Sequence, residues 1–550
     1  MSLWPGILVE EVEEERAPEP REVETEPPTS RLWWGWSIVL AAATATPRLA
    51  YLFLFTDPEN PGVRRYDDVW HHWQIAYLTK EIGLQAPDGP RLWDLKGLEY
   101  FWGILHPLLM AAVFSVTGSI DIVLNRLVSV VFGVAVVLLV FHLCRRYWGN
   151  HVGLAAALVA ITLPTSVMND ASGMLEPIGV FLCLLGVWAW SRGDGLWAGI
   201  AFGLATMARA EAWIFSVGLV AAAFLGRPRT RQLWWLFAGF GGVMLLYMKV
   251  LQDHTGNAIY PLWWNFFANA AGKWEFTAVN AGQASVRPVL GVLLVASSIG
   301  LAWSLWRRPA SYMLLTFGFG YWVFVAGMLG FTAYLASWVW WMPITRVFAF
   351  PYVFAGILFA VALLWCAPRR FGKRVIPWSW GALAVTLVAC QLAWIPIAKV
   401  FGPSELDWRA VKAESVALGG WYNASPYAGH SIALPPDRPE ITYALARFGG
   451  VEGKHLVSEM YGPFAYVRAG YRFEDHQSTV NTLLECWFTD TDIRLIAIAH
   501  NDQNLLLAVQ LNPGWFVRVG SMADAGWIVD GVSAPKPSAA DCEAARSASR

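Results

Sequence analysis

The sequence predicts a mainly helical, polytopic membrane protein with a small C-terminal α+β domain. Of its 550 residues, 56% are apolar and 15% are charged, and the mean hydropathy is +0.42. Apolar runs long enough to cross a hydrocarbon core of about 30 Å as helices recur through residues 31–400. The 33 Trp suit the membrane–water interface, and a net charge of −1 offers no basic face to nucleic acid.

About eleven membrane spans are expected within residues 31–400. Residues 1–30 lack the features of a signal peptide. They are expected to be a disordered, acidic cytoplasmic tail. The run 195–226 is divided because Arg209-Ala210-Glu211 interrupts it, although one kinked span is the alternative. The expected spans are 33–55, 122–143, 151–168, 174–191, 195–208, 210–226, 232–251, 286–306, 310–330, 343–366 and 375–398.

Basic connections indicate the orientation of these spans. With the N-terminus in the cytoplasm, all of them fall on the cytoplasmic side if the stretch 101–117 does not cross the membrane. This stretch is therefore expected to be an interfacial or re-entrant helix within a first extracytoplasmic loop, 56–121. The basic connections are Arg145-Arg146, Arg192, Arg227/Arg229/Arg231, Arg307-Arg308 and Arg369–Arg374.

The tail after the last span is expected on the same extracytoplasmic face. Residues 401–532 are expected to form a soluble α+β domain, with strands at Leu495–Ile498 and Leu505–Val509 between Gly, Asn and Pro turns. A disordered end is expected at 533–550. Cys486 and Cys542 can pair if this region is extracytoplasmic.

Titratable residues gather where the first span meets water, in Arg65-Tyr66-Asp67-Asp68-Val69-Trp70-His71-His72-Trp73. Such groups at a membrane boundary are a functional-site hypothesis by default. Asp67 and Asp68 are candidate catalytic carboxylates, because attack by a hydroxyl or amide on an activated sugar needs a base at the acceptor. The alternative is that they cap a helix in a hydrated loop.

His71 and His72 each follow an aspartate by four residues, so on a helix each shares a face with its aspartate. They are candidate substrate-binding residues that grip the substrate or a phosphate. The alternative is a divalent metal, Mg or Mn, with Asp67, His71 and Glu176 as its ligands. No HExxH-type pattern supports a metal.

Three further candidates lie on the same predicted face of the membrane. Glu176 is a candidate second catalytic acid, or else an acid that stabilises a helix N-terminus beside Pro177. Arg209 and Arg346 are candidates for binding a phosphate, because a guanidinium stabilises a departing anion. The alternatives are an ion pair of Arg209 with Glu211 and snorkelling of Arg346 to lipid headgroups.

These residues together resemble the GT-C superfamily of membrane glycosyltransferases, which use polyprenyl-phosphate-linked sugars. Tyr66–His71 resembles the Asp-Glu motif in the first loop of protein O-mannosyltransferases and aminoarabinose transferases. It also resembles the Asp-Pro-Tyr-x-His motif of oligosaccharyltransferase catalytic subunits. Both comparisons place the catalytic acid on Asp67.

Three later segments carry the resemblance further along the chain. The helix that opens His106-Pro107-Leu108-Leu109 resembles the non-crossing helix of the family, and Ser172–Glu176 resembles its second acidic motif. Ala205–Glu211 resembles the Thr-Arg-Tyr-Glu-Gly stretch of prokaryotic members, with Ala210 replacing the aromatic residue. The resemblance thereby adds His106 and Glu211 to the candidate substrate-binding residues.

The resemblance implies a GT-C fold and an inverting glycosyltransferase in the inner or plasma membrane of a prokaryote. It would move one sugar from a polyprenyl-phosphate donor to an extracytoplasmic glycan, lipid or protein. The sequence lacks Trp-Trp-Asp-Tyr-Gly, which disfavours an oligosaccharyltransferase that transfers a whole glycan to protein, but this stays an alternative. The second alternative is a lipid or glycan transporter, which would be expected to show paired broken helices and symmetry between its halves.

Overall fold

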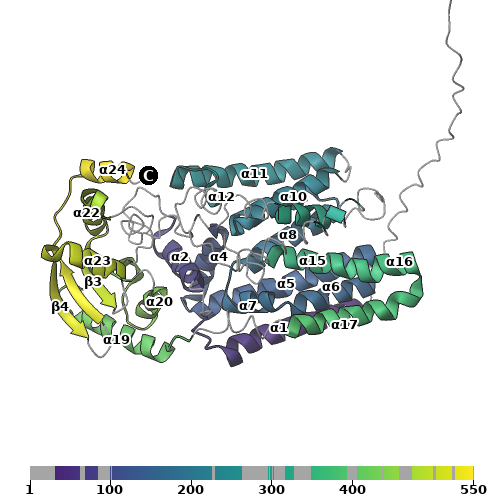
Figure 1. Ribbon diagram of the computed structural model, residues 1–550, viewed down its shortest axis with the longest axis horizontal. Coiled ribbons are helices and arrows are strands. Elements are labelled where there is room, and N and C mark those ends of the chain that lie inside the picture. The colour runs from purple at the N-terminus through teal and green to yellow at the C-terminus, as the bar shows by residue number, and fades with distance from the viewer. Residues whose placement is uncertain are drawn as a thin grey trace, which may run out of the picture.

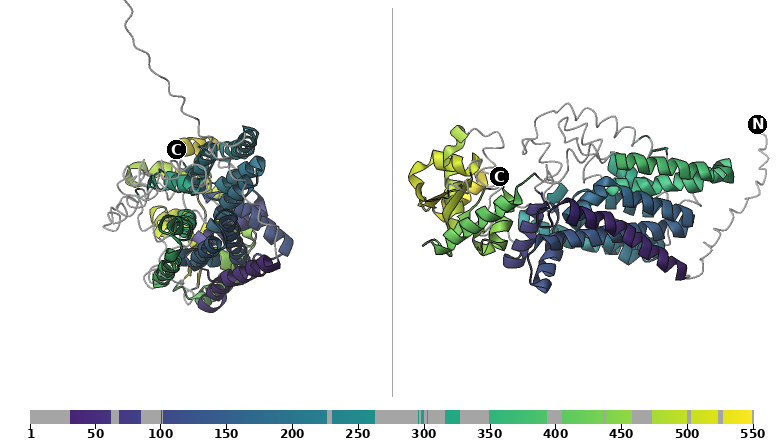
Figure 2. Two further views of the ribbon diagram at one scale, coloured as in Figure 1. Left: turned by 90° about the vertical axis from the view of Figure 1, so that its right-hand side faces the viewer. Right: turned by 90° about the horizontal axis from the view of Figure 1, so that it is seen from below.

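The computed structural model describes residues 31–61, 68–84, 100, 102–225, 230–262, 295, 298–299, 302, 316–326, 349–392, 405–435, 438–457, 473–499, 503–522 and 527–548. In these residues the protein is mainly helical, as predicted. An elongated helical bundle lies at one end and a mixed α/β unit from the C-terminal part of the chain at the other (Figures 1 and 2). Two shorter helices, α2 (Asp68–Ile82) and α4 (Leu105–Thr117), lie between them.

The bundle contains the apolar helices that the sequence predicts. Its elements are α1 (Arg31–Ala50), η1 (Tyr51–Phe55), α5 (Ile122–Trp148), α6 (Asn150–Thr162), α7 (Pro164–Ser172), α8 (Glu176–Ser191), α9 (Gly195–Ala208), α10 (Glu211–Leu225), α11 (Thr230–Thr255), α12 (Tyr260–Leu262), α15 (Ala349–Val361), η5 (Ala362–Cys366), α16 (Ala367–Phe371), η6 (Lys373–Val375) and α17 (Ile376–Leu392).

Four helical segments in the described part of the chain are long and apolar enough to cross a membrane: Trp34–Phe55, Ile122–Trp148, Thr230–Thr255 and Tyr352–Phe371. The predicted span 151–168 is bent by 60° between α6 and α7. Pro164 opens α7, and a proline has no N–H with which to continue the hydrogen bonds of α6. The predicted span 286–306 lies largely outside the described residues, and of 310–330 the structure describes the apolar helix Thr316–Ala326, so the count of eleven stays a prediction.

The run 195–226 forms two helices that fold back on each other. Arg209 ends α9 in an extended conformation, with φ −156° and ψ 145°. Across the resulting hairpin, Trp213 Nε1 donates to Thr206 O at 3.0 Å and Ser216 Oγ donates to Phe202 O at 3.1 Å. The sequence was therefore divided at the correct place, and the turn carries the charged residues Arg209 and Glu211.

Glycines bring α9 and α11 into close contact. A Cβ on Gly199 would lie 2.3 Å from Leu236 O, and one on Gly239 would lie 2.4 Å from Leu196 O. Only glycine fits where the backbones of two helices come this close. Small residues usually have this role between membrane helices. This packing holds α9 closely along α11.

Several basic connections gather at the end of the bundle away from the C-terminal unit. Tyr147, beside Arg145-Arg146, donates to Ser191 O at 3.4 Å, next to Arg192. Gln232, beside Arg231, donates to Trp190 O at 2.9 Å. The ring of His151 contacts the ring of Trp380 at 6.1 Å, which brings the α5–α6 turn beside the start of α17. Figure 1 shows α16, which carries Arg369 and Arg370, at this same end.

The C-terminal unit is built around a five-stranded mixed sheet in the order β2-β1-β3-β5-β4. Strand β1 pairs in parallel with β2 and β3, and β5 pairs antiparallel with β3 and β4. Its elements are α19 (Trp408–Ala424), β1 (Ser431–Ala433), α20 (Pro439–Arg447), η7 (Gly453–His455), β2 (Leu456–Val457), α22 (Phe473–Asp490), β3 (Ile493–Ala499), α23 (Gln503–Leu511), η8 (Pro513–Trp515), β4 (Phe516–Met522), β5 (Trp527–Val532) and α24 (Ala539–Ala548).

Two predictions for this unit are wrong. Leu495–Ile498 lies in β3 as expected, but Leu505–Val509 lies in the helix α23 and not in a strand. Three of its five residues are Leu and one is Ala, and these residues lose little or no side-chain freedom in a helix. The segment 533–550, expected to be disordered, contains α24. A disulfide holds this helix in place, between the two cysteines that the sequence analysis gave as a possible pair.

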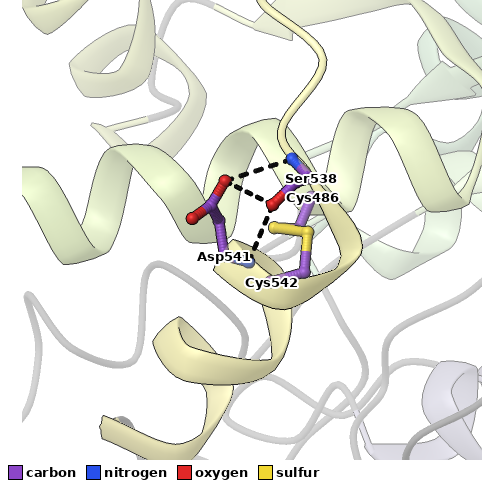
Figure 3. The surroundings of a disulfide bond; sticks show 4 residues. All are labelled: Cys486, Ser538, Asp541 and Cys542. Carbon is purple, nitrogen blue, oxygen red and sulfur yellow. Dashed lines mark hydrogen bonds between the residues drawn. A yellow bond between two sulfur atoms is a disulfide. The ribbon is translucent and has the colours of Figure 1, made fainter.

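The disulfide joins Cys486 on α22 to Cys542 on α24 (Figure 3). Beside it, Ser538 Oγ donates to Asp541 Oδ2 at 2.6 Å, and Asp541 N donates to Ser538 Oγ at 3.2 Å. Ser538 therefore satisfies an N–H in the first turn of α24, as capping residues do. Cap and disulfide together order the C-terminal end of the described chain.

Helix α4 has 13 residues, so at 1.5 Å per residue it spans only about 20 Å. That is shorter than the hydrocarbon core, but α9, with 14 residues, is almost as short, so the statement that 101–117 does not cross stays a prediction. The helix packs against α2 and against the end of α9. Both helices between the bundle and the C-terminal unit therefore lie beside the turn that carries Arg209.

Candidate active site

Helix α2 has two faces with different partners. Trp70, Trp73 and Tyr77 recur at helical spacing and face the C-terminal unit. Trp70 stacks on Trp408 with 5.3 Å between ring centroids, Trp73 meets Tyr443 edge-on at 4.8 Å, and the Tyr77 hydroxyl accepts from Gly453 N at 3.1 Å. One apolar core runs continuously from α2 into this unit.

The opposite face of α2 presents buried histidines to α4, because His72 lies about 200° around the helix from Trp70. His72 meets Trp102 edge-on, with 4.6 Å between ring centroids, and lies 5.8 Å from the ring of His106. His71 lies beside it, with Nδ1 3.3 Å from Gln74 Oε1. The structure therefore brings together the three histidines that the sequence proposed separately.

Burial keeps these imidazoles neutral. It lowers the pKa of His71 to about 4 and that of His106 to about 3. Burial also lowers the pKa of His72, which the charges of His106, Arg209 and His71 lower further. Within the described residues, both ring nitrogens of His106 and the Nε2 atom of His72 lack a hydrogen-bond partner. Neutral imidazoles can donate and accept at once, which suits them to the hydroxyls of a sugar.

The loop before α4 brings these histidines against Arg209. Gly103 has φ +115°, and a Cβ there would lie 2.3 Å from Met207 O and 3.0 Å from the carbonyl carbon of Ala208. Only glycine fits this approach. The segment Trp102–His106 is therefore pressed onto the last turn of α9, where Arg209 begins the turn to α10.

Arg209 is the centre of a buried charge network. Its Nε donates to Glu211 Oε2 at 2.9 Å, and its Nη2 donates to Glu211 Oε1 at 2.7 Å, which is a bidentate pair. Its Nη1 lies 3.5 Å from Glu176 Oε1. The side chains of Arg209 and Glu176 are 4% and 1% exposed. The ion pair that the sequence offered as the alternative role of Arg209 is therefore present, and it includes Glu176.

Glu176 is the first residue of α8, the position that its alternative role as an acid at a helix N-terminus requires. It also lines a pocket inside the bundle. Other charged and polar side chains at this pocket are Arg48 and Asp170, whose Nε and Oδ2 atoms form a buried ion pair of 2.6 Å, and Asn169. Apolar residues from α5, α6, α8 and α15 complete the lining. Glu176 therefore faces both the Arg209 network and this pocket.

Sequence reasoning missed the buried arginines Arg48 and Arg126. Both are fully buried, at 1% and 0% exposed. A charged residue within an apolar span is costly in lipid and usually has a partner, so Pro47-Arg48 and Asn125-Arg126 carried a signal that was not used.

Two predicted catalytic or binding residues, Asp67 and Arg346, lie outside the described residues. Asp68 opens α2 and is half-buried, and it shares a helix face with His72, as the spacing of four residues predicts. Within the described part of the chain, no group of three His, Cys, Asp or Glu residues is placed to hold a metal ion. The proposed ligand set of Asp67, His71 and Glu176 includes a residue outside that part.

The buried histidines make stability depend on pH. The folded protein holds the pKa of His106 at about 3, whereas an unfolded chain binds that proton near pH 6.5. The stability from neutral His106 is therefore present above pH 6.5 and is lost as the pH falls, at about 1.4 kcal/mol per pH unit. We expect the thermal midpoint in detergent to drop between pH 7 and pH 5, and His106→Leu to flatten this drop. An equal drop in the variant would contradict the assignment.

Comparison with known proteins agrees with this geometry. Residues 103–251, which include His106, Glu176, Arg209 and Glu211, match the family dolichyl-phosphate-mannose-protein mannosyltransferase. No curated protein sequence matches the chain significantly.

Solved structures of glycosyltransferases are similar in fold. The oligosaccharyltransferase of Archaeoglobus fulgidus is 12% identical, with a TM-score of 0.50 over 84% of this chain and 69% of that chain. ArnT from Cupriavidus metallidurans is 13% identical, with a TM-score of 0.48 over 92% of this chain and all of the other. The mycobacterial arabinofuranosyltransferase AftD is 14% identical, with a TM-score of 0.46 over 92% of this chain and 40% of that chain.

The family match covers the helices that build the buried charge network, and the similarity to the archaeal enzyme extends over both the bundle and the C-terminal unit. Residues 103–251 therefore match the model of the dolichyl-phosphate-mannose-protein mannosyltransferase family, and the chain shares its fold with the archaeal oligosaccharyltransferase.

Proposed function

We propose that the protein is an inverting glycosyltransferase that moves one sugar from a polyprenyl-phosphate-linked donor to an acceptor outside the cytoplasm. The observation that carries this proposal is the buried network of Arg209, Glu176 and Glu211 beside His72 and His106. It lies at the bundle end that faces the C-terminal unit, where the headgroup of a membrane-embedded donor would be held. The description of the matched family names a dolichyl-phosphate sugar as donor.

The transfer requires one bond to form and one to break. The acceptor oxygen or nitrogen attacks the anomeric carbon and loses its proton to the carboxylate of Asp67. The bond between the anomeric carbon and the phosphate oxygen breaks, and the polyprenyl phosphate leaves with both electrons. A single displacement of this kind inverts the anomeric centre and needs one base. Asp68, half-buried at the start of α2, would assist in orienting the acceptor.

Arg209 is placed to stabilise the departing phosphate. Two of its nitrogens are held by Glu211, and this fixes the plane of the guanidinium. Nη1 lies farther from its partner, at 3.5 Å from Glu176, and a phosphate oxygen that approached Nη1 would gain a charge-assisted hydrogen bond. Arg346 is the second arginine proposed for the phosphate. Glu176, His71, His72 and His106 would then bind hydroxyl groups of the sugar.

The proposed sidedness has two supports in the structure. The basic connections near Arg145, Arg192, Arg231 and Arg370 lie at one end of the bundle, as the positive-inside rule expects for the cytoplasmic side. The C-terminal unit at the other end contains a disulfide, and disulfides persist in oxidising compartments. Both observations favour a C-terminal unit and an active site outside the cytoplasm of an inner or plasma membrane.

Cysteine labelling tests this topology. A single cysteine at Lys273 is expected to react with a membrane-impermeant reagent in intact cells, as is one at Arg550, because both positions follow outward crossings in the proposed layout. A cysteine at Arg307 is expected to react only after permeabilisation. Labelling at Arg307 in intact cells, without labelling at Lys273, would place the active site on the wrong side.

Purified protein in liposomes tests the activity itself. A radiolabelled sugar on polyprenyl phosphate is expected to be transferred to an acceptor in a membrane extract, with release of polyprenyl phosphate. The matched control is the same sugar on a nucleotide, which should not be used. Transfer only of a whole glycan from a pyrophosphate-linked lipid would instead support the oligosaccharyltransferase alternative. Movement of the donor across the bilayer without transfer would support the transporter alternative.

A further inference from the structure

Arg126, in the first turns of α5, makes an unusual set of contacts for a buried cation. Its Nε donates to Ala171 O at 2.7 Å, and its Nη1 donates to Asp57 O at 2.8 Å and to Pro58 O at 3.0 Å. Its Nη2 donates to the hydroxyl of Thr56 at 2.6 Å. The guanidinium therefore binds three backbone carbonyls and one hydroxyl from two separate segments of the chain.

The two segments are those that lead to the proposed catalytic carboxylates. Thr56, Asp57 and Pro58 follow the first span and lead in sequence to Asp67 and Asp68. Ala171 lies at the end of α7, directly before the turn that leads to Glu176 at the start of α8. One side chain thus ties the end of the first span to the turn that leads to the second acid.

The turn before Glu176 also rests directly on α5. Ser129, one helical turn after Arg126, donates through Oγ to Met174 O at 2.8 Å. Gly173 has φ +89°, and a Cβ there would lie 3.2 Å from the backbone N of Arg126. The turn is therefore seated on the α5 backbone, so α5 is a fixed reference for the position of Glu176.

We propose that Arg126 is a positioning residue that holds residues 56–58, at the end of the first span, against the turn that leads to Glu176, and thereby sets the position of Glu176. This inference rests on the proposed function, because the position of Glu176 matters for transfer only if its carboxylate acts on the substrate. The guanidinium suits this role because its planar fork has donors in fixed directions, which reach both segments at once. A lysine would keep the charge but lose that fork.

Exchange of backbone amide hydrogens measures the positioning without any activity. We expect Arg126→Gln to increase deuterium uptake both in peptides covering 56–61 and in peptides covering 169–176, because both segments lose their anchor. Ser129→Ala is the matched control, since Ser129 holds only Met174. It should increase uptake in 169–176 and leave 56–61 unchanged. Arg126→Lys should fall between wild type and Arg126→Gln.

The kinetic arm uses the same variants in the liposome assay. A displacement of a catalytic group by about 1 Å can cost about 100-fold in rate, so Arg126→Gln is expected to lower kcat by about that factor. Thr56→Val should give a smaller fall. Combined with Arg126→Gln it should add little, because both changes remove the same contact.

The outcomes separate the two proposals. Uptake that rises in both segments, together with the fall in kcat, supports the positioning role. Uptake that rises only in 169–176, or a kcat for Arg126→Gln within threefold of wild type, overturns it. If the wild-type protein transfers no sugar, the proposed function fails, while the exchange data still decide whether Arg126 holds both segments.

Discussion

Replacement of Asp67 by asparagine is expected to abolish sugar transfer while the protein still folds and inserts into the membrane. The amide keeps the size of the side chain but cannot accept the proton of the acceptor. Loss of a general base typically costs about 100-fold to 10,000-fold in rate. The measurement is transfer of labelled sugar in membranes that contain matched amounts of each variant.

Asp68→Asn is the neighbouring control for this experiment. Asp68 begins α2, so it shares the local backbone but not the proposed role as the base. Its replacement is expected to have a milder effect than that of Asp67. If Asp67→Asn transfers sugar within threefold of wild type, Asp67 is not the base, and a stronger effect of Asp68→Asn would move that role to Asp68.

Replacement of Arg209 by glutamine is expected to affect both stability and donor binding. It removes the cation between Glu211 and Glu176 and leaves two buried carboxylates side by side. Breaking a buried ion pair from one side typically costs about 3–5 kcal/mol. The variant alone therefore cannot separate a structural role from a role in binding the donor phosphate.

The double variant Arg209→Gln with Glu211→Gln separates the two roles, because it restores the charge balance at the turn. Its thermal stability is expected to return toward that of wild type. The donor KM should still be raised, since a charge-assisted hydrogen bond to phosphate contributes about 1.5–3 kcal/mol, or about 10-fold to 150-fold. The acceptor KM should change far less.

Arg346→Ala is the comparison for the same assay, because the sequence alone proposes Arg346 as a further residue that binds phosphate. If only Arg346→Ala raises the donor KM, while the stable double variant binds donor as wild type does, then Arg209 serves only as the centre of a structural ion pair. If both raise it, the two arginines bind the phosphate together. Arg346→Lys should rescue partly, because an ammonium keeps the charge without the planar fork.

The sequence alone determined those properties that depend on residues close together in the chain. Apolar runs predicted helices at α1, α5, α8, α9, α11 and α17, because hydrophobic length is a local property. The charges of Arg209 and Glu211 located the break between α9 and α10. The distribution of the basic connections predicted that the helix around His106 does not cross the membrane. Spacing by four residues placed Asp68 and His72 on one face of α2.

The tertiary structure decided which of these residues meet. Glu176 comes beside Arg209 because the start of α8 lies against the turn between α9 and α10, and His106 comes beside His72 because α4 packs against α2. The partners of Arg126 lie 45 to 70 positions away in sequence, so no local pattern reports them. A hydrophobic pattern predicts that a side chain is buried, but its contacts depend on how the helices pack.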